Sequence, residues 1–567
     1  QGLFQIRNKS PETIDSLYVN YSFSQKEGEL VKFTIDGQSP ESILYDSVHQ
    51  FEIYHLPRPM LPGDSATLEI EVNLAYQGFP NEGYQREIIH NGSFLNSGIF
   101  PTFGYNNQKE ISSDLQRKKH GLEPKDYVAP PPTDSFGLRN LLFEDDADFV
   151  TFEAVISTSP DQIAMAPGRL EEEWEENGRR YFRYRNRGLI QNFFNISSAR
   201  YAVEEDTWHG ANGQEVKIQI YHHPTHNYNL DRLNESVKAS MDYFNANFSP
   251  FQFQQMRILE FPRYASFAQS FPNTVPYAES FGWVADFSDP EDTDYAFYVT
   301  AHEVAHQWWG HQIAPSATRG SNQISETMAQ YGAMMVLKKR YGEAVMPKFL
   351  KYELNSYLTG RANEGKFEKT LLDNDTQAYV WYRKGANIMY TLQDYLGEDS
   401  LNLAFQHFLQ DYALRNEPPY ATSLDWYRYM QEVTPDSLQY FLKESFETIT
   451  LYENRAVTAT ATPTDDGRYR VKMTIDTKKL TYDGNGNETG QPTEASLIEI
   501  GIFGPDGKNQ YGMTEKHPLY LRKHWLEPGQ HQIEIVVDEL PVKAGIDPYN
   551  KLIDRITDDN LIDVEIL

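Results

Sequence analysis

The chain has 567 residues, too many for a single hydrophobic core, so we expect three or four domains. Its formal net charge is −30 and it has no basic block, so neither nucleic acid nor an anionic membrane surface is an expected partner. The absence of cysteine excludes disulfides, a cysteine nucleophile and thiolate zinc sites. No apolar run reaches the roughly 18 residues that span a bilayer, and a chain beginning at Gln1 is expected to be a fragment or processed form.

Residues 1–205 are predicted to form an N-terminal β domain. Val150, Phe152 and Ala154 alternate with polar neighbours, which is the pattern of a half-buried strand. Turn-forming residues recur between such stretches, as expected for a strand-rich region.

Residues 206–453 are predicted to form a second domain, mixed at first and then helical. An alternating strand begins near Val216, a helix is expected at about 229–247, and a short strand at 257–261. From 292 to about 451 the pattern is helical, with short loops between the helices.

Three histidines follow the strand near Val216, namely His222, His223 and His226. They could bind a metal ion, but their spacing suits neither one face of a helix nor one face of a strand. We therefore expect a solvated strand end at this point.

Residues 454–567 return to strand patterns and predict a C-terminal β-sandwich. Apolar and polar residues alternate from 469 to 475, after a turn at 465–467.

One loop of this region resembles a calcium loop in part. Asp483, Asn485, Asn487 and Glu494 occupy positions 1, 3, 5 and 12 of that template. Position 6, which requires glycine, is Glu488, and the flanks are strands. A hairpin loop is therefore the favoured interpretation, with calcium as the alternative.

The strongest chemical signal is His302-Glu303-Val304-Ala305-His306, an H-E-x-x-H motif inside a helical pattern. Positions i and i+4 lie on one face of a helix, so His302 and His306 could bind one metal ion. Such a short pattern also arises by chance, and the alternative is an ordinary polar helix face.

A hydrolytic zinc site needs a third protein ligand and an open position for water. Glu326 lies twenty residues after His306, which is enough chain for a turn and the start of another helix. It could therefore return to the metal, and the alternative is a surface glutamate in a first helical turn.

Glu303 then has a defined task as the general base. Zinc lowers the pKa of bound water to about 7, and a neighbouring carboxylate can move its proton to the leaving amine. The developing oxyanion needs a second donor, for which a tyrosine hydroxyl would serve.

The chain resembles the gluzincin aminopeptidases, the family of aminopeptidase N and leukotriene-A hydrolase. The segments that carry the resemblance are 302–310, Ser325-Glu326, the Tyr-x-Lys-Gly-like segment Tyr382–Gly385 and Thr274–Ser280. The resemblance implies a multidomain α+β protein with an N-terminal β domain, a thermolysin-like catalytic domain and a C-terminal β-sandwich. It also implies one zinc ion and peptide substrates with a free N-terminus.

The resemblance assigns roles to individual residues. It implies that Tyr382 stabilises the tetrahedral intermediate and that Tyr379 matches a second family tyrosine. It implies that Glu279 binds the α-amine of the substrate, in a segment that lies along the substrate backbone and includes Tyr277 and Ala278. A carboxylate placed near the metal would pair with the ammonium group and set the cut one residue in.

This segment departs from the family pattern Gly-x-Met-Glu-Asn. Pro276, Ala278 and Ser280 replace the Gly, Met and Asn, which puts the first specificity pocket in question. The spacing from His306 to Glu326 is also one residue longer than in most of the family. The second amine-binding residue of the family is not evident, and its candidates are His90, Asn91 and Asn96.

Further stretches resemble bacterial peptidase domains fused behind ABC-type permeases; they are 91–96, 103–105 and 266–274. That branch implies a peptidase tethered to a membrane permease on the extracytoplasmic or periplasmic side. The oligomeric state is not indicated by the sequence.

The leading hypothesis is a zinc aminopeptidase. The alternative, motivated by the altered segment 276–280, is a catalytically weak or inactive peptide-binding or sensing module attached to a membrane transporter. Endopeptidase action is a third possibility.

Overall fold

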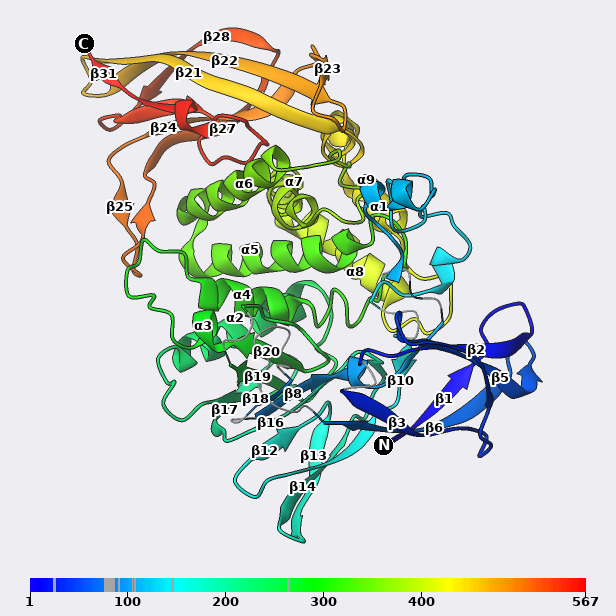
Figure 1. The fold of residues 1–567 in the computed structure, drawn as a ribbon. Coiled ribbons are helices and arrows are strands. Elements are labelled where there is room, and N and C mark those ends of the chain that lie inside the picture. The colour runs from blue at the N-terminus through cyan, green and yellow to red at the C-terminus, as the bar shows by residue number, and fades with distance from the viewer. Residues whose placement is uncertain are drawn as a thin grey trace.

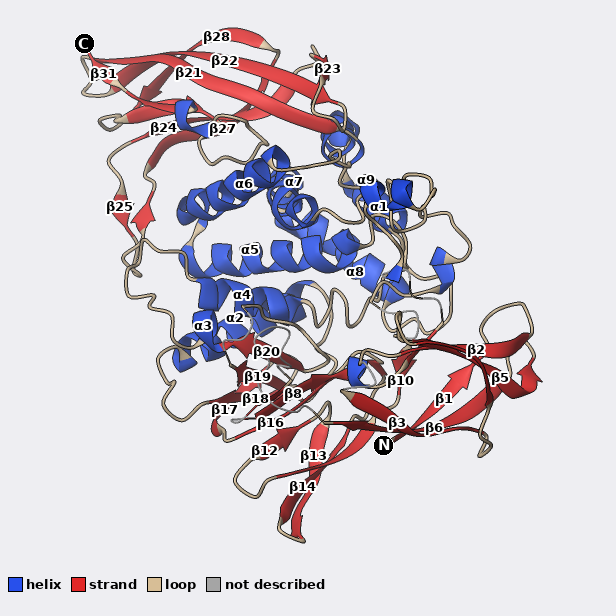
Figure 2. Ribbon diagram, viewed as in Figure 1, coloured by secondary structure: helices blue, strands red, loops and turns tan. Residues whose placement is uncertain are grey.

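A computed structural model of the chain describes residues 1–23, 27–75, 87–89, 92–104, 106, 109–143, 147–262 and 266–567. It shows strands at the N-terminal end, a central group of helices and further strands at the C-terminal end (Figures 1 and 2). The predicted multidomain α+β architecture is confirmed. Within the described residues, no helix is both long and apolar enough to cross a bilayer.

The N-terminal part contains two sheets around one core. Their strands are β1 (Gly2–Arg7), β2 (Ile14–Asn20), β3 (Gly28–Ile35), β4 (Glu41–Asp46), β5 (Phe51–Met60), β6 (Ser65–Leu74) and β9 (Thr102–Phe103). The strand orders are β1-β6-β3 and β4-β5-β2-β9. Ile35, Leu68 and Ile70 are buried between them, because alternate residues of each strand face the same side.

Further strands connect this part to the centre. They are β7 (Ile88–Ile89), β8 (Gly92–Asn96), β10 (Phe149–Val150), β11 (Glu153–Thr158), β12 (Ile163–Met165), β13 (Arg169–Glu176), β14 (Arg179–Arg185), β15 (Ile190–Gln191) and β16 (Asn195–Ala199). They form the sheets β12-β16-β8-β7, β11-β14-β13 and β10-β15, and a short helix α1 (Asp114–Lys119) follows β9 in the chain.

The central part begins with a sheet in the order β17-β18-β19-β20. These strands are β17 (Ala202–His209), β18 (Glu215–His222), β19 (Gln255–Phe261) and β20 (Thr274–Ala278). The last three are parallel, so their carboxyl ends meet at one edge of the sheet. The helices α2 (Leu230–Asn247), α3 (Glu279–Gly282) and α4 (Tyr295–Ala305) lie beside it (Figure 1).

The rest of this part is helical. Its helices are α5 (Met328–Tyr341), α6 (Met346–Ala362), α7 (Gly385–Leu396), α8 (Glu398–Tyr412), α9 (Ser423–Val433) and α10 (Gln439–Leu442). Two wider π-helical segments, 323–327 and 379–384, precede α5 and α7 respectively.

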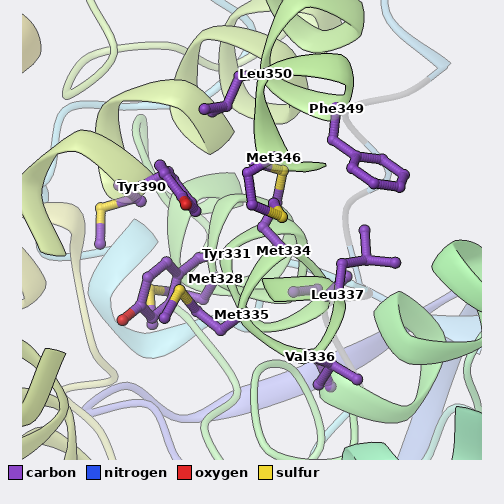
Figure 3. Close-up of a cluster of buried hydrophobic side chains, with 14 of the residues drawn as sticks. Met328, Tyr331, Met334, Met335, Val336, Leu337, Met346, Phe349, Leu350 and Tyr390 are labelled. Carbon is purple, nitrogen blue, oxygen red and sulfur yellow. The ribbon is translucent and has the colours of Figure 1, made fainter. Parts of the chain in front are cut away.

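Helix α5 is buried on nearly all sides. Figure 3 shows Met328, Tyr331 and Leu337 packed among side chains of neighbouring helices, including Phe349 of α6 and Tyr390 of α7. An apolar surface around the whole helix explains why its sequence has no single apolar stripe. The helix therefore holds the preceding segment 323–327 firmly in the interior.

The C-terminal part contains two larger sheets that share buried side chains, and one short two-stranded sheet. Its strands are β21 (Ile449–Pro463), β22 (Tyr469–Tyr482), β23 (Glu488–Gly490), β24 (Ser496–Phe503), β25 (Gly507–Lys508), β26 (Thr514–Glu515), β27 (Pro518–Leu526), β28 (Gly529–Val537), β29 (Lys543–Ile546), β30 (Leu561–Asp563) and β31 (Glu565–Ile566). The domain limits 205/206 and 453/454 stay predictions, and they fall inside β17 and β21.

The loop with partial calcium spacing is a hairpin between β22 and β23. The Asp483 carboxylate accepts hydrogen bonds from the backbone N–H and the side-chain amide of Asn487, at 2.9 and 3.0 Å. Gly486 has a φ of +80°, which glycine adopts without strain.

Candidate metal centre

The two histidines of the H-E-x-x-H motif lie at the buried end of α4. Asp294 caps the start of this helix, where its carboxylate accepts the backbone N–H of Phe297 at 3.0 Å. His302, Glu303 and His306 are all buried. The helix therefore presents the motif to the interior rather than to solvent.

Glu326 completes a compact triangle of ligand atoms with the histidines. The Nε2 atoms of His302 and His306 are 3.0 Å apart, and Glu326 Oε2 lies 3.4 and 3.3 Å from them. These are close to the edge lengths of a tetrahedral site with metal–ligand distances of about 2.0–2.1 Å.

The chemistry of this triangle fits a metal cation. Glu326 Oε2 is buried without a hydrogen-bond partner, although it faces two imidazoles. Two imidazole nitrogens and one carboxylate oxygen form a typical zinc ligand set. The residues present are therefore suited to hold zinc.

His306 is oriented by the backbone that follows it. Its Nδ1 donates to the Trp309 carbonyl at 2.9 Å, which leaves Nε2 directed toward His302 and Glu326. A bond from the outer nitrogen to a carbonyl fixes the tautomer that a metal ligand requires. Gly310 allows this turn, because its φ is +129°.

The charges of the site shift one another. Burial lowers the pKa of His306, but the Glu326 carboxylate, the Glu303 carboxylate and the Trp309 carbonyl together outweigh burial and raise that pKa to about 9. Burial raises the pKa of Glu326, but His306 and His302 outweigh burial and hold that pKa well below its usual range.

Glu303 differs from Glu326 although both belong to the same site. Burial raises the pKa of the Glu303 carboxyl to about 7, with a further rise from Glu326 and an opposing effect of His306. A carboxyl group with a pKa near neutrality can both accept and release a proton.

Tyr382 lies beside this triangle on the π-helical segment 379–384. Its ring centroid is 5.8 Å from that of His302. Burial, together with the Glu326 carboxylate, holds the pKa of Tyr382 well above its usual range. The hydroxyl therefore stays protonated and can donate a hydrogen bond.

Tyr379 faces another partner. Its hydroxyl donates to Glu364 at 3.2 Å, and its ring stacks on Tyr357. The predicted substrate contact of Tyr379 would therefore have to compete with Glu364.

Tyr277 and Ala278 are enclosed in the structure, and their substrate contacts stay predictions. Both side chains are completely buried, and the Tyr277 hydroxyl lies 3.4 Å from the Tyr295 carbonyl. The Ala278 backbone N–H donates to the Phe267 carbonyl at 3.0 Å. In this conformation the preceding loop covers the edge of β20 at these residues.

Glu279 follows β20 and begins α3. One oxygen of Glu279, one oxygen of Glu260 and one ring nitrogen of His226 all lie within 4.8 Å of one another. These groups are brought together because β19 and β20 are parallel and end at the same edge. Glu279, which is predicted to bind the α-amine of the substrate, thus lies in an anionic environment.

The prediction of a solvated end for β18 was wrong in part. His222 is buried and stacks on Trp283, and His226 Nδ1 forms a hydrogen bond to the buried Glu260 carboxylate. Only His223 is exposed. The partner comes from β19, which local spacing in the sequence could not reveal.

The candidates for a second amine-binding residue are placed only in part. Asn96 caps a short 3₁₀ turn, where its side chain accepts the Gly98 backbone N–H at 3.0 Å. His90 and Asn91 lie outside the described residues, as does Tyr105 of the stretch 103–105.

Sequence comparison places the central region near a known peptidase family. Residues 228–449 match the Peptidase family M1 domain. The chain is 22% identical over 197 residues to tricorn protease-interacting factor F2 of Thermoplasma volcanium, covering 33% of this chain and 24% of that protein. It is 24% identical over 216 residues to human endoplasmic reticulum aminopeptidase 2, covering 36% and 22% respectively. The matches thus span about a quarter of these relatives.

Structural comparison extends over more of the chain. An M1 zinc metallopeptidase from Deinococcus radiodurans superimposes with a TM-score of 0.54 at 13% identity, covering 78% of this chain and 89% of that one. Legionella pneumophila aminopeptidase A in complex with aspartic acid gives 0.55 at 16% identity, covering 98% and 55%. The chain therefore has the fold of M1 metallopeptidases, and the combined matches support a peptidase.

Proposed function

We propose that the chain is a zinc-dependent aminopeptidase that removes N-terminal residues from peptides. The observation that carries this proposal is the triangle of His302, His306 and Glu326, with Glu303 and Tyr382 beside it. One zinc ion held there would polarise the scissile carbonyl and lower the pKa of bound water.

Glu303 acts as the general base and then as the general acid. Its buried carboxyl has a pKa of about 7, so it is partly ionised at neutral pH. It takes a proton from the attacking water and delivers it to the leaving amine as the peptide bond breaks.

Tyr382 stabilises the carbonyl oxygen as negative charge develops. Its hydroxyl remains protonated because burial raises its pKa. A fixed donor in a buried site lowers the barrier without reorganising during the reaction.

Glu279 binds the substrate ammonium group and so selects N-terminal residues. The carboxylate of Glu260 nearby adds to the negative potential at this edge. A charge-assisted hydrogen bond there would fix the substrate relative to the metal. The proposal assigns no residues to the first specificity pocket, because Tyr277 and Ala278 are enclosed.

The proposal includes attachment to a bacterial membrane permease, with the peptidase on the extracytoplasmic side. Its support is the resemblance of 91–96, 103–105 and 266–274 to permease-fused peptidases. Immunoblots of membrane and soluble fractions from the native host would test it, and recovery only in the soluble fraction would contradict it.

A panel of aminoacyl anilides and matched N-acetylated peptides tests the function, with and without a chelator. The proposal predicts cleavage of free-amino substrates only, loss of activity on chelation and recovery with zinc. Cleavage of acetylated peptides would indicate an endopeptidase instead. Bound zinc without hydrolysis would indicate the peptide-binding module, which the covered edge of β20 favours.

A further inference from the structure

One buried carboxylate lies outside the proposed catalytic residues and joins the helical segments that carry those residues. Glu353 of α6 has no exposed side-chain surface. It accepts the Tyr298 hydroxyl at 2.7 Å and Arg383 Nη1 at 3.1 and 3.0 Å through its two oxygens. Gln330 Nε2 lies 3.4 Å from Glu353 Oε1 and donates to the Tyr298 hydroxyl at 3.1 Å.

Each of these partners lies close to a residue of the proposed site. Tyr298 is on α4, one turn before His302 and on the same helical face. Gln330 lies at the start of α5, four residues after Glu326.

Arg383 forms the third link, because it directly follows Tyr382 in the chain. Its positive charge also acts on Tyr382, where it opposes the rise of the pKa. The Glu353–Arg383 pair therefore bears on the position and the electrostatic environment of this hydroxyl.

The position of Glu353 in α6 is unusual for a charged residue. The buried stripe of that helix includes Phe349, Leu350, Leu354 and Tyr357, and Glu353 stands within it. An apolar side chain is often at least as stabilising as a buried ion pair at such a position. Stability alone therefore does not account for a carboxylate here.

We propose that Glu353 is a positioning residue that holds Tyr382, through Arg383, in a fixed place relative to the His302 end of α4. The part of this inference that concerns turnover rests on the proposed peptidase function. Outer contacts of this kind typically change metal affinity or activity by about 10- to 100-fold when they are removed.

The test compares Glu353→Gln, Arg383→Gln and the double variant with the wild type. Glu444→Gln serves as a matched control, because Glu444 also forms an enclosed ion pair, with Lys479 Nζ at 2.7 Å. Each zinc-loaded protein is assayed for kcat and KM on an aminoacyl anilide, and for the rate of zinc release to a chelator. Glu353→Gln leaves only Arg383 without its ionic partner, and Arg383 is 30% exposed and can reach water, so this variant should fold even where Arg383→Gln, which leaves the enclosed carboxylate unpaired, does not.

We expect both single variants to lower kcat about 10- to 100-fold with little change in KM, and the double variant to be no worse than either one. Glu353→Gln should also release zinc faster than Glu444→Gln. Additive losses, or a lowered melting temperature with unchanged kcat, would overturn the inference and leave a purely structural pair.

A wild type that holds zinc but hydrolyses nothing would refute the proposed function alone. Zinc release then decides the inference about Glu353. Faster release from Glu353→Gln than from the Glu444→Gln control supports it, and equal rates refute it.

Discussion

At the scale of single residues, environment separates groups that are chemically alike. Glu303 and Glu326 are glutamates of one site, yet burial raises the pKa of the first to about 7 and two histidines lower that of the second. The first can therefore exchange protons near neutral pH, while the second remains an anion, as its proposed role as a metal ligand requires.

Replacing Tyr382 by phenylalanine removes the proposed oxyanion donor and little else. We expect kcat to fall about 100- to 1,000-fold, with KM and zinc content nearly unchanged. Steady-state kinetics with metal analysis measures this. A kcat close to the wild-type value would remove Tyr382 from the mechanism.

Replacing Glu279 by glutamine tests recognition of the substrate amine. The loss of a charged hydrogen bond should raise KM for aminoacyl anilides about 10- to 100-fold. The exposed Glu215, 73% accessible, provides a Glu215→Gln control that should leave KM unchanged. Equal KM values for the two variants would contradict the assigned role.

At the scale of helices and strands, packing determines structural features that the local sequence pattern does not specify. The helix expected at about 229–247 is α2 (Leu230–Asn247), because its apolar spacing is strong enough to specify it. The turns at 323–327 and 379–384 are π-helical, and nothing in their spacing predicts this. A π turn holds one residue more than an α turn, so the first can absorb the longer spacing between His306 and Glu326.

The site could be predicted from the sequence as far as one helix or one motif reaches. His302 and His306 follow from i, i+4 spacing, and Glu326 was expected from its distance along the chain. The contacts of Glu260 and Glu353 depend on strands and helices that meet only in the fold. The enclosure of Tyr277 likewise depends on the loop that covers β20.

Helix α5 should control the metal site through its packing. Leu337 is completely buried, so Leu337→Ala should destabilise the protein by about 2–5 kcal/mol and lower its melting temperature. Because α5 continues from the segment that carries Glu326, zinc should also be released faster. The matched control is Leu403→Ala on α8, where the side chain is 46% exposed.

Differential scanning fluorimetry and chelator-driven zinc release measure the two effects. Loss of stability without faster zinc release would separate α5 packing from the metal site.

At the scale of the whole molecule, the C-terminal strands are joined to the central helices by buried polar groups. Lys551 Nζ lies 3.1 Å from Asp394 Oδ2 of α7 and 3.1 Å from Glu499 Oε2 of β24. Asp554 receives backbone N–H groups from Asn454 at 2.9 Å and Ile556 at 3.0 Å. The Lys551 contacts make the two parts depend on each other for stability, whereas the Asp554 contacts lie within the C-terminal part.

Burial raises the pKa of Asp554 from 3.8 to about 7, which predicts a pH dependence of stability. Between these values the folded chain binds one more proton than the unfolded chain at this group, so its contribution to stability falls as pH rises. In Asp554→Asn this dependence is absent. The melting temperature of the variant minus that of the wild type should therefore be higher at pH 8 than at pH 5, and a pH-independent difference would contradict the assignment.

The most direct test of the central claim is turnover by Glu303→Gln with zinc content measured in the same sample. The account predicts about one zinc ion per chain, as in the wild type, and loss of nearly all hydrolysis of aminoacyl anilides. Hydrolysis at the wild-type rate with zinc bound would contradict it.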